Sequence, residues 1–259
     1  MSGGAEAGLS VGGAVAVVLA AGSGDRLGHG TPKGFVTVGG RSILAVAAEA
    51  AAACPEVGSL VVAVPAGWEV QAAAEVPASK PVAVVAGGRS RHESVRLALA
   101  AVPVDTTAVL VHDAARCLAS PGLFRAVLAA LVDADGVVPV IAVPDTVKRI
   151  RDGRVVATES RDELGLAQTP QGFRAAALRD AHRRAEAEGL EFTDDAAAVE
   201  WAGYTVRAIP GERENFKITT PEDLARADAL LSRADAGSSP SPPSPAATPE
   251  ATGSIRTRG

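Results

Sequence analysis

A glycine-rich segment near the start of the chain is accompanied by two cationic residues. The segment Leu19–Leu27 reads LAAGSGDRL, contains Arg26, and is followed beyond a proline by Lys33. Glycines let backbone N–H groups approach an anion closely, and a neighbouring arginine and lysine suit a polyphosphate. The spacing G-x-G-x-x-x-G matches neither the dinucleotide fingerprint nor the P-loop. The segment predicts a phosphate-binding loop, and a plain strand-to-loop turn with two solvated cations is the alternative.

A second glycine turn, Gly87–Val95 (GGRSRHESV), opens a helical stretch. Its backbone amides are suited to reading the edge of a base, with Ser94 as hydrogen-bond donor or acceptor. The alternative is an ordinary helix start capped by Ser90, which the turn taken alone favours.

The segment His112–Arg116 (HDAAR) places an acid directly after an apolar run. Asp113 at the carboxyl end of a strand, with Arg116 close behind, is suited to holding a hydroxyl group or a metal ion beside a phosphate. A local pair between Asp113 and Arg116 is the alternative. His112 is expected to be structural, because the chemistry favoured below needs no base.

Two polar clusters come late in the chain, Gln168–Gln171 (QTPQ) and Asn215–Thr220 (NFKITT). The formal net charge is -5, yet cations gather around the turns. These cations are Arg26, Lys33, Arg89, Arg116, Arg161 and Lys217. Such a distribution favours a small, highly charged phosphate ligand over a nucleic acid, which needs an extended basic face. The aromatic content of 3% also argues against a base-stacking platform.

Composition excludes several other classes. The two cysteines, Cys54 and Cys117, are too few for a disulfide framework or a four-ligand zinc site. No apolar run reaches the roughly 18 residues of a membrane span. The first residues, MSGGAEAGLSVGG, lack a basic region typical of a signal peptide. We expect a cytoplasmic protein without a membrane or nucleic-acid partner.

Apolar runs of strand length alternate with helical stretches, and this alternation is what positions the polar segments. The predicted strands are Ala14–Ala20, Ser59–Val64, Val82–Ala86, Ala108–Val111 and Gly136–Val143. The predicted helices are Ser42–Ala53, Glu93–Ala101, Pro121–Val132, Arg174–Glu188 and one that opens at Thr220. Near-continuous apolar strands indicate burial on both faces. We predict an α/β fold, a Rossmann-like, three-layer, mostly parallel sheet, with ligands beyond the carboxyl ends of its strands.

The segment Lys148–Val156 (KRIRDGRVV) interrupts the alternation with a polar hairpin that turns at Asp152-Gly153. It predicts either a β-arm that reaches a second subunit or a solvated surface hairpin. The expected organisation is a mobile N-terminus over 1–12 and one domain over 13–233 with the arm at about 145–167. A Ser/Pro-rich stretch over 234–259 cannot bury enough apolar surface to order and is expected to be disordered.

The first glycine segment resembles the loop of sugar-phosphate nucleotidyltransferases. Together and in order, the motifs resemble those of the 2-C-methyl-D-erythritol 4-phosphate cytidylyltransferase family over roughly residues 14 to 233. The segments that carry the resemblance are Leu19–Leu27 with Pro32-Lys33, Ala86–Val95, His112–Arg116, Asp145–Lys148, Gln168–Gln171, Thr193–Asp195 and Asn215–Thr219. One departure is Cys117, where the family usually has a proline; this changes the stiffness of the loop more than its chemistry.

The resemblance implies a homodimer joined by a β-arm that transfers CMP from CTP to methylerythritol phosphate with Mg²⁺, whose ligands it leaves unknown. It implies that Arg26 and Lys33 stabilise the pentacoordinate phosphorus, and that Arg161 and Lys217 position the acceptor. The implied substrate-binding residues are Ala20, Ala21, Gly22, Gly24, Gly88, Ser94, Asp113, Arg116, Thr146 and Thr169. Thr146 and Arg161 would come from the partner subunit.

Three other functions stay open at this point. A ribitol 5-phosphate cytidylyltransferase shares the chemistry and differs in the acceptor pocket. A non-catalytic nucleotide-binding module is disfavoured because it has no need of transition-state cations such as Arg26 and Lys33. A dinucleotide-dependent oxidoreductase is disfavoured by the glycine spacing.

Overall fold

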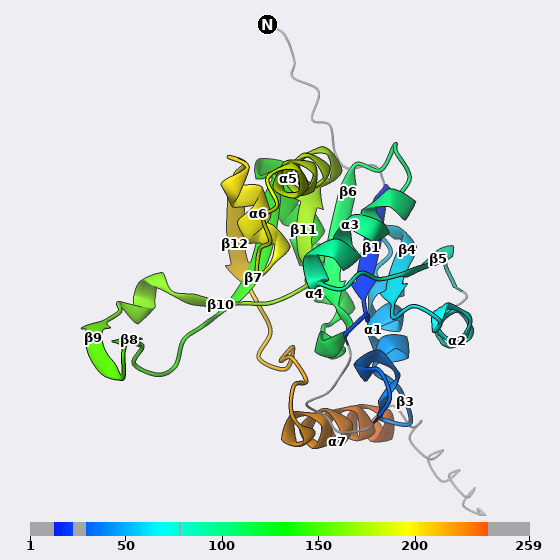
Figure 1. Ribbon diagram of the computed structural model, residues 1–259. Coiled ribbons are helices and arrows are strands. Elements are labelled where there is room, and N and C mark those ends of the chain that lie inside the picture. The colour runs from blue at the N-terminus through cyan, green and yellow to red at the C-terminus, as the bar shows by residue number, and fades with distance from the viewer. Residues whose placement is uncertain (1–12, 23–29, 78, 238–259) are drawn as a thin grey trace, which may run out of the picture.

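A central sheet organises the chain, which is seen in a computed structural model that describes residues 13–22, 30–77 and 79–237 (Figure 1). The strand order is β10-β7-β11-β6-β1-β4-β5, and β12 also pairs with β7. The strands are β1 (Ala14–Leu19), β4 (Val57–Val64), β5 (Val82–Ala86), β6 (Ala108–Asp113), β7 (Gly136–Ala142), β10 (Gly165–Ala167), β11 (Gln171–Arg174) and β12 (Val206–Pro210). The predicted α/β class with a mostly parallel sheet is confirmed.

The sequence of β1 explains why this strand lies at the centre. It reads AVAVVL, and all but its last residue are buried. Because side chains alternate across a strand, Ala16 and Val18 join one apolar cluster, and Val15 and Val17 join the other. Parallel pairing with β4 on one side and β6 on the other satisfies its backbone. The strand is therefore covered on both faces, as its unbroken apolar run predicts.

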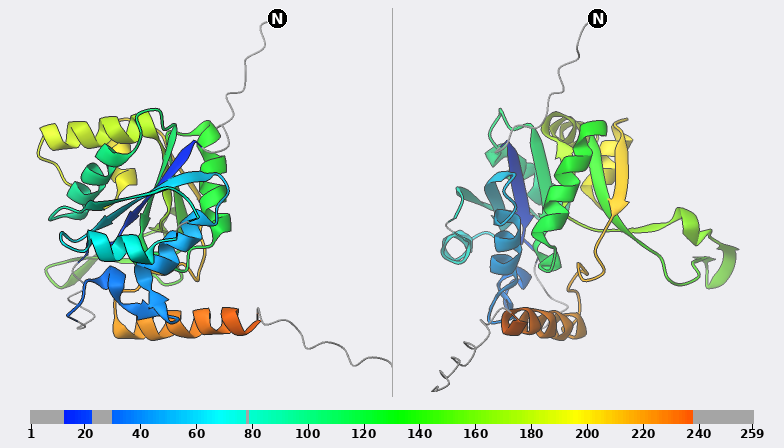
Figure 2. Two further views of the ribbon diagram at one scale, coloured as in Figure 1. Left: turned by 90° about the vertical axis from the view of Figure 1, so that its right-hand side faces the viewer. Right: turned by 180° about the vertical axis from the view of Figure 1, so that it is seen from behind.

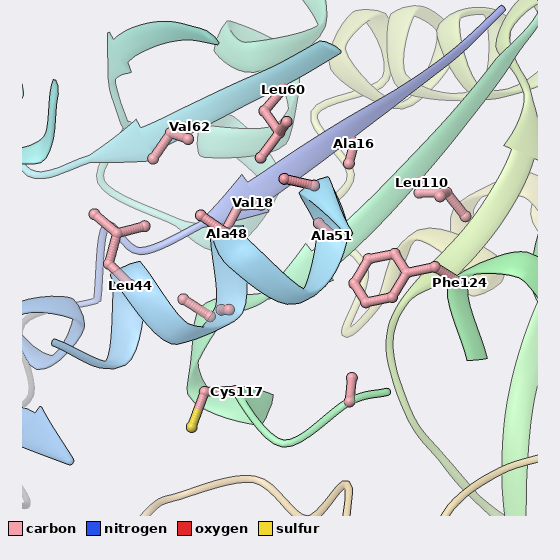
Figure 3. Packing of buried hydrophobic residues seen from close by; sticks show 14 of the residues in the cluster. Ala16, Val18, Leu44, Ala48, Ala51, Leu60, Val62, Leu110, Cys117 and Phe124 are labelled. Carbon is pink, nitrogen blue, oxygen red and sulfur yellow. The ribbon is translucent and has the colours of Figure 1, made fainter. Parts of the chain in front are cut away.

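Helices cover the two faces of the sheet (Figure 2). On one face, α1 and α4 pack against β1, β4 and β6, and Figure 3 shows Leu44 and Ala48 of α1 near Val62 and Val18. On the other face lie α3, α5 and α6. The helices are α1 (Ile43–Ala52), α2 (Glu69–Glu75), α3 (Arg91–Ala101), α4 (Pro121–Ala130), α5 (Ala175–Ala187), α6 (Asp195–Trp201) and α7 (Pro221–Gly237). No helix within the described ranges is long and apolar enough to cross a membrane.

Side chains fix where several helices begin. The hydroxyls of Ser42, Ser90 and Ser120 accept the backbone N–H groups of Ala45, Glu93 and Leu123 at the starts of α1, α3 and α4, respectively. Ser90 and Ser120 are therefore the caps that the sequence predicts. At α7, the backbone N–H of Thr220 donates to Asp223, and that of Asp223 to the Thr220 hydroxyl, as in a capping box.

The polar hairpin forms a separate β-arm that projects from one side of the molecule (Figure 1). Its strands are β8 (Lys148–Arg151) and β9 (Arg154–Thr158), and every residue of both is exposed. Asp152 and Gly153 have φ angles of 49° and 74°, as a type I′ turn requires. The arm is shorter than the predicted 145–167, because β10 (Gly165–Ala167) pairs with β7 in the main sheet.

Some elements differ from the sequence prediction. β11 lies antiparallel between β6 and β7, and β10 is also antiparallel, so one half of the sheet is mixed. A two-stranded β2–β3 hairpin (Thr37–Val38 and Arg41–Ser42), together with α2, α6 and β12, was not predicted. The last helix extends to Gly237, beyond the expected end of the domain at 233. Residues 238–259 of the expected disordered tail lie outside the described ranges, and so does the expected mobile N-terminus over 1–12.

Candidate active site

A cavity of about 540 Å³ opens where β1, β5 and β6 end. Because these strands are parallel, their carboxyl ends lie at one edge of the sheet, where α/β proteins bind ligands. The cavity is lined by Leu19, Ala20, Ala21, Gly22, Lys33, Gly34, Gly88, Arg89, Ser90, Arg91, Ser94, Asp113, Ala114, Ala115, Lys217 and Thr219. The structure thus brings together residues from all three predicted polar segments and from Asn215–Thr220.

Lys33 and Gly34 lie against the end of β1 and line the cavity. The N–H of Ala20 continues the sheet ladder to the carbonyl of Ala63 at 2.8 Å, and the N–H of Lys33 donates to the carbonyl of Gly22 at 3.3 Å. A Cβ atom on Gly34 would lie 2.9 Å from the Cβ of Ala20, so the chain packs closely here. The predicted residues Arg26 and Gly24 lie outside the described ranges.

The second glycine turn is tied to Ser94 and shaped for close packing. The N–H of Gly88 donates to the Ser94 hydroxyl at 3.0 Å, and that hydroxyl donates to the carbonyl of Ser90 at 2.8 Å. A Cβ atom on Gly87 would lie 2.4 Å from the Cβ of Ala21, and one on Gly88 would overlap the side chain at position 93. Glycine at position 87 therefore lets this turn approach the chain at Ala21, and glycine at position 88 leaves room for the side chain at position 93.

Asp113, the last residue of β6, carries the charge at the cavity floor. It is 8% exposed, and its two carboxylate oxygens lie 3.0 Å from Nε of Arg91 and 2.8 Å from Nζ of Lys217. Burial would raise the pKa of this carboxyl group, but the charges of Arg91 and Lys217 outweigh burial and hold the pKa well below its usual range. Asp113 therefore stays ionised between two cations.

Arg116 does not form the local pair with Asp113 that the sequence offered as an alternative. Its guanidinium donates instead to the carbonyls of Asn215 and Ala167, both at 3.0 Å. Burial lowers the pKa of Arg116 from its ordinary value. Arg116 thus anchors the segment that carries Lys217.

A buried amide network holds the same segment. Gln168 is 2% exposed, and its Nε2 donates to the carbonyls of Glu212 and Asn215 at 2.8 and 3.1 Å. Nδ2 of Asn215 donates to the carbonyl of Thr169 at 2.8 Å. Lys217 is therefore presented from a fixed backbone, although its own side chain is 42% exposed.

A second cavity of about 220 Å³ adjoins the first and shares Arg91, Asp113 and Lys217 with it. Its lining residues are Arg91, Asp113, Arg116, Ala167, Gln168, Thr169, Gln171, Thr193, Asp194 and Lys217. The predicted residues Arg116 and Thr169 lie here. The Thr169 hydroxyl accepts the N–H of Asp113 at 3.0 Å, which ties this wall to the shared floor.

His112 lines neither cavity in the described part of the chain. It is fully buried, with Nδ1 3.1 Å from the Thr169 hydroxyl and its ring edge against Phe124. Burial lowers its pKa to about 4, so the ring is neutral at pH 7. These contacts fit the structural role predicted for it.

The structure does not bring Thr146 or Arg161 to either cavity of its own chain. Thr146 is exposed in the segment that enters the arm. Arg161 begins the short helix η5 (Arg161–Glu163), and its guanidinium donates to the carbonyl of Pro144 at 2.9 Å. Both residues therefore lie outside the two cavities of their own chain, and the resemblance assigns them to the site of a partner subunit.

Arg91 lies at the shared floor, a position that was not predicted for it from the sequence. It stands inside the predicted motif Gly87–Val95 but was not singled out among the cations. The signal lies in its partners, Asp113 and Asp195, which are distant in the sequence. Only the folded chain shows that α3 directs this side chain toward both.

The described residues include no group of three or more His, Cys, Asp or Glu side chains arranged to hold a metal ion. Asp113 is the one carboxylate at the shared floor, and both its oxygens already contact cations. Mg²⁺ commonly binds through one or two carboxylates plus substrate phosphates and water. This donor set fits a Mg²⁺ ion carried in on phosphate oxygens rather than one held in a cage of protein ligands.

The fold is an α/β sheet with two adjoining cavities at the carboxyl ends of its strands, an arrangement typical of the nucleotidyltransferase class. The family model described as IspD: 2-C-methyl-D-erythritol 4-phosphate cytidylyltransferase matches residues 14–233. The chain belongs to this family and is a cytidylyltransferase.

Individual relatives agree with the family match. A 2-C-methyl-D-erythritol 4-phosphate cytidylyltransferase of Frankia casuarinae is 48% identical over 222 residues, which cover 85% of this chain and 82% of that protein. The crystal structure of the Thermus thermophilus enzyme of that name superposes with a TM-score of 0.70 at 38% identity, covering 84% of this chain and 98% of that one. A 4-diphosphocytidyl-2C-methyl-D-erythritol synthase from Anaerococcus prevotii gives 0.75 at 29% identity, covering 85% and 98%.

Proposed function

We propose that the enzyme transfers CMP from CTP to 2-C-methyl-D-erythritol 4-phosphate in the cytoplasm. The products are 4-diphosphocytidyl-2-C-methyl-D-erythritol and pyrophosphate. The observation that carries this proposal is the pair of adjoining cavities with a common floor at Arg91, Asp113 and Lys217. Two ligands that meet over such a floor have their phosphates next to each other, as a transfer between them requires.

The larger cavity suits the nucleotide. Its glycine turn offers the close backbone approach that a flat base needs, with Gly88 and Ser94 hydrogen-bonded to each other. The segment from Ala20 to Gly22 and Lys33 line the same cavity, and we expect the triphosphate to run along them. We assign Lys33, and by the family resemblance Arg26, to stabilising charge on the α-phosphorus.

The smaller cavity suits the acceptor. Thr169 and Arg116 line it, and Lys217 stands where it meets the larger one. A phosphate monoester at this boundary would lie next to the Lys217 ammonium, with Asp113 accepting from the other side of that ammonium. We therefore assign Lys217 to positioning the acceptor phosphate.

The reaction needs positioning and positive charge more than acid–base chemistry. An acceptor phosphate oxygen forms a bond to the α-phosphorus of CTP in line with the bond to the leaving pyrophosphate, which breaks. A phosphate monoester is already a competent nucleophile, so no side chain has to remove a proton. Fixed cations that meet the charge gathering on phosphorus and on pyrophosphate supply the rate enhancement. Mg²⁺ bound to the triphosphate would add charge neutralisation there.

We propose that the active enzyme is a homodimer in which each arm completes the partner's site. Apolar side chains that a docked subunit would cover are exposed in the arm, at Ile150, Val155 and Val156, and just after it, at Leu164 and Leu166. Among the residues that the structure describes, Arg161 donates a hydrogen bond to the carbonyl of Pro144 and lines neither cavity. Contact with a partner would give both the apolar residues and Arg161 a function.

The test is a direct assay of pyrophosphate release. The enzyme is incubated with Mg²⁺, CTP and methylerythritol phosphate, and in parallel with ATP, GTP or ribitol 5-phosphate in place of the cognate substrate. We expect release with CTP and methylerythritol phosphate and much less in the other mixtures. Equal turnover of ribitol phosphate would reassign the acceptor, and no release with CTP would refute the proposal.

A further inference from the structure

A chain of charged side chains runs from the protein interior to the floor shared by both cavities. Asp195 begins α6 and is 1% exposed, and its Oδ2 lies 2.8 Å from Nη2 of Arg91. Arg91 begins α3 and directs Nε to Oδ1 of Asp113 at 3.0 Å. Oδ2 of Asp113 accepts from Lys217 at 2.8 Å. One arginine therefore links a carboxylate at the site to one that lies away from it.

Asp195 has no access to either ligand cavity, because it lines neither. Its Oδ1 lies 3.0 Å from Nε2 of His182, which is itself 1% exposed. Burial would raise the pKa of Asp195, but the charge of Arg91 and the contact with His182 hold the pKa below its usual value. A buried carboxylate is costly to keep ionised, and the ion pair with Arg91 is the charged contact that links Asp195 to the shared floor.

The geometry of the guanidinium group explains what Asp195 contributes. A guanidinium is planar and rigid, and Arg91 presents different nitrogens to its two partners. The ion pair with Asp195 keeps Nη2 turned away from Asp113, so in the described contacts Nε donates to one oxygen of Asp113 and Lys217 donates to the other. Without that hold, the guanidinium would turn to take both oxygens of Asp113, the bidentate arrangement that arginine and carboxylate favour. Lys217 would then lose its anchor.

We propose that Asp195 is a positioning residue: through Arg91 it keeps one oxygen of Asp113 directed at Lys217 and so fixes the Lys217 ammonium at the boundary of the two cavities. This role rests on the proposed function, in which Lys217 positions the acceptor phosphate.

The first variant is Asp195→Asn, which keeps the size of the side chain and removes its charge. We expect the KM for methylerythritol phosphate to rise about 10-fold and kcat to fall about 10-fold, with the KM for CTP changed by less than about 2-fold. Loss of folded enzyme alone would lower kcat and leave both KM values unchanged. A wild-type KM for the acceptor would overturn the proposal.

The second variant, Arg91→Lys, keeps the cation but cannot bridge two carboxylates. It should raise the acceptor KM at least as much as Asp195→Asn does. If Asp195 acts only through Arg91, the double variant is no worse than Arg91→Lys, because the second change removes nothing further. Additive effects on the acceptor KM would overturn the proposal. Should Asp195→Asn not fold, Arg91→Lys decides alone, and an unchanged acceptor KM counts against the proposal.

The matched control is a surface ion pair between α3, which carries Arg91, and α5, which carries His182. Arg96 of α3 pairs with Glu186 of α5 at 3.2 Å on the surface, away from both cavities. Arg96→Gln should leave all three kinetic constants within about 2-fold. Wild-type enzyme that releases no pyrophosphate would overturn the proposed function itself. Active wild-type enzyme with an unaffected Asp195→Asn variant would overturn only the positioning role.

Discussion

The cavity floor and the projecting arm hold their charged side chains in opposite ways. At the floor, Asp113 is 8% exposed and lies between Arg91 and Lys217, each within 3.0 Å. In the arm, Arg149 and Glu159 form an ion pair of 2.7 Å whose arginine side chain is 65% exposed. Surface pairs of this kind contribute about 0–1 kcal/mol, whereas a charge left alone at a buried site is costly.

In the proposed dimer, this difference would correspond to two ways of supplying a residue to one active site. The main domain fixes its charges by burial and by mutual pairing before any substrate arrives. Arg161 lies in an exposed segment, so in the proposed dimer its position would depend on the surface against which the arm docks. We expect variants of the domain to act on each chain separately and variants of the arm to act across subunits.

The largest expected effect is at Lys33, which lines the larger cavity. Lys33→Ala should lower kcat by about 10²-fold or more, because it removes a charge that meets the developing transition state. The fold should survive, and thermal unfolding checks this. By the family resemblance, Arg26→Ala should act alike. Arg125→Ala, which removes an exposed cation paired with Glu56, is the control and should leave turnover unchanged. A near-wild-type kcat in Lys33→Ala would favour the alternative interpretation, in which the loop is a plain turn with solvated cations.

Those parts of the fold with a strong local pattern could be predicted from the sequence. The apolar run of β1 and the Ser120-Pro121 start of α4 each carry enough information on their own. β11 reads QGFR and has no such run; its Gly172 is required because a Cβ there would lie 2.4 Å from Val127. β11 is a strand because it pairs with β6 and β7, and four residues without an apolar run do not carry enough information to predict that pairing.

The candidate site divides in the same way. Asp113 and Ser94 were predicted because they follow strands, and strand ends meet at one edge of a sheet. The partners that orient them were not, since they come from distant segments. Arg116 contacts the backbone carbonyls of Asn215 and Ala167, and no side-chain pattern reports a carbonyl partner.

The second effect in size tests whether the arm acts across subunits. Lys33→Ala and Arg161→Ala chains are each expected to be inactive as homodimers. After exchange, a mixed dimer has one site with both changes and one with neither. With about half of the dimers mixed, activity should recover to about a quarter of wild type per subunit.

Two outcomes would break the contrast between domain and arm. If Arg161 acts within its own chain, every site keeps one change and mixing restores nothing. A monomer by light scattering with full turnover would also contradict shared sites. Unmixed homodimers taken through the same exchange protocol are the control for reactivation by the procedure itself.

The third effect concerns the free energy of unfolding at low pH. We expect it to depend on a buried histidine of the main domain and not on the arm. The pKa of His112 is lowered to about 4 by burial, against about 6.5 in an unfolded chain. The unfolded chain therefore takes up this proton first, so the stability is present above about pH 6.5 and is lost as the pH falls toward 4. At pH 5.5 the loss from His112 is about 1.4 kcal/mol.

The variant His112→Asn removes the titrating group and keeps a polar atom near the Thr169 hydroxyl. Between pH 7.5 and pH 5.5, urea unfolding of the wild type should show a loss of free energy about 1.4 kcal/mol greater than that of the variant. Burial also lowers the pKa of His92. Because both proteins contain His92, its contribution cancels when the two losses of free energy are compared. Equal losses would show that His112 does not contribute.

The smallest effect compares one hydrogen bond in each region. The Ser42 hydroxyl accepts the N–H of Ala45 at 3.0 Å and caps α1 beneath the sheet, whereas the Thr158 hydroxyl accepts from Lys148 at 2.7 Å on the exposed arm. Ser42→Ala should lower the free energy of unfolding by about 1 kcal/mol, because it leaves a helix N–H without its cap. Thr158→Ala should change it by less than about 0.5 kcal/mol, because water replaces the lost partner. Urea unfolding measures both, and a Thr158 effect as large as that of Ser42 would mean that the arm is as firmly held as the domain.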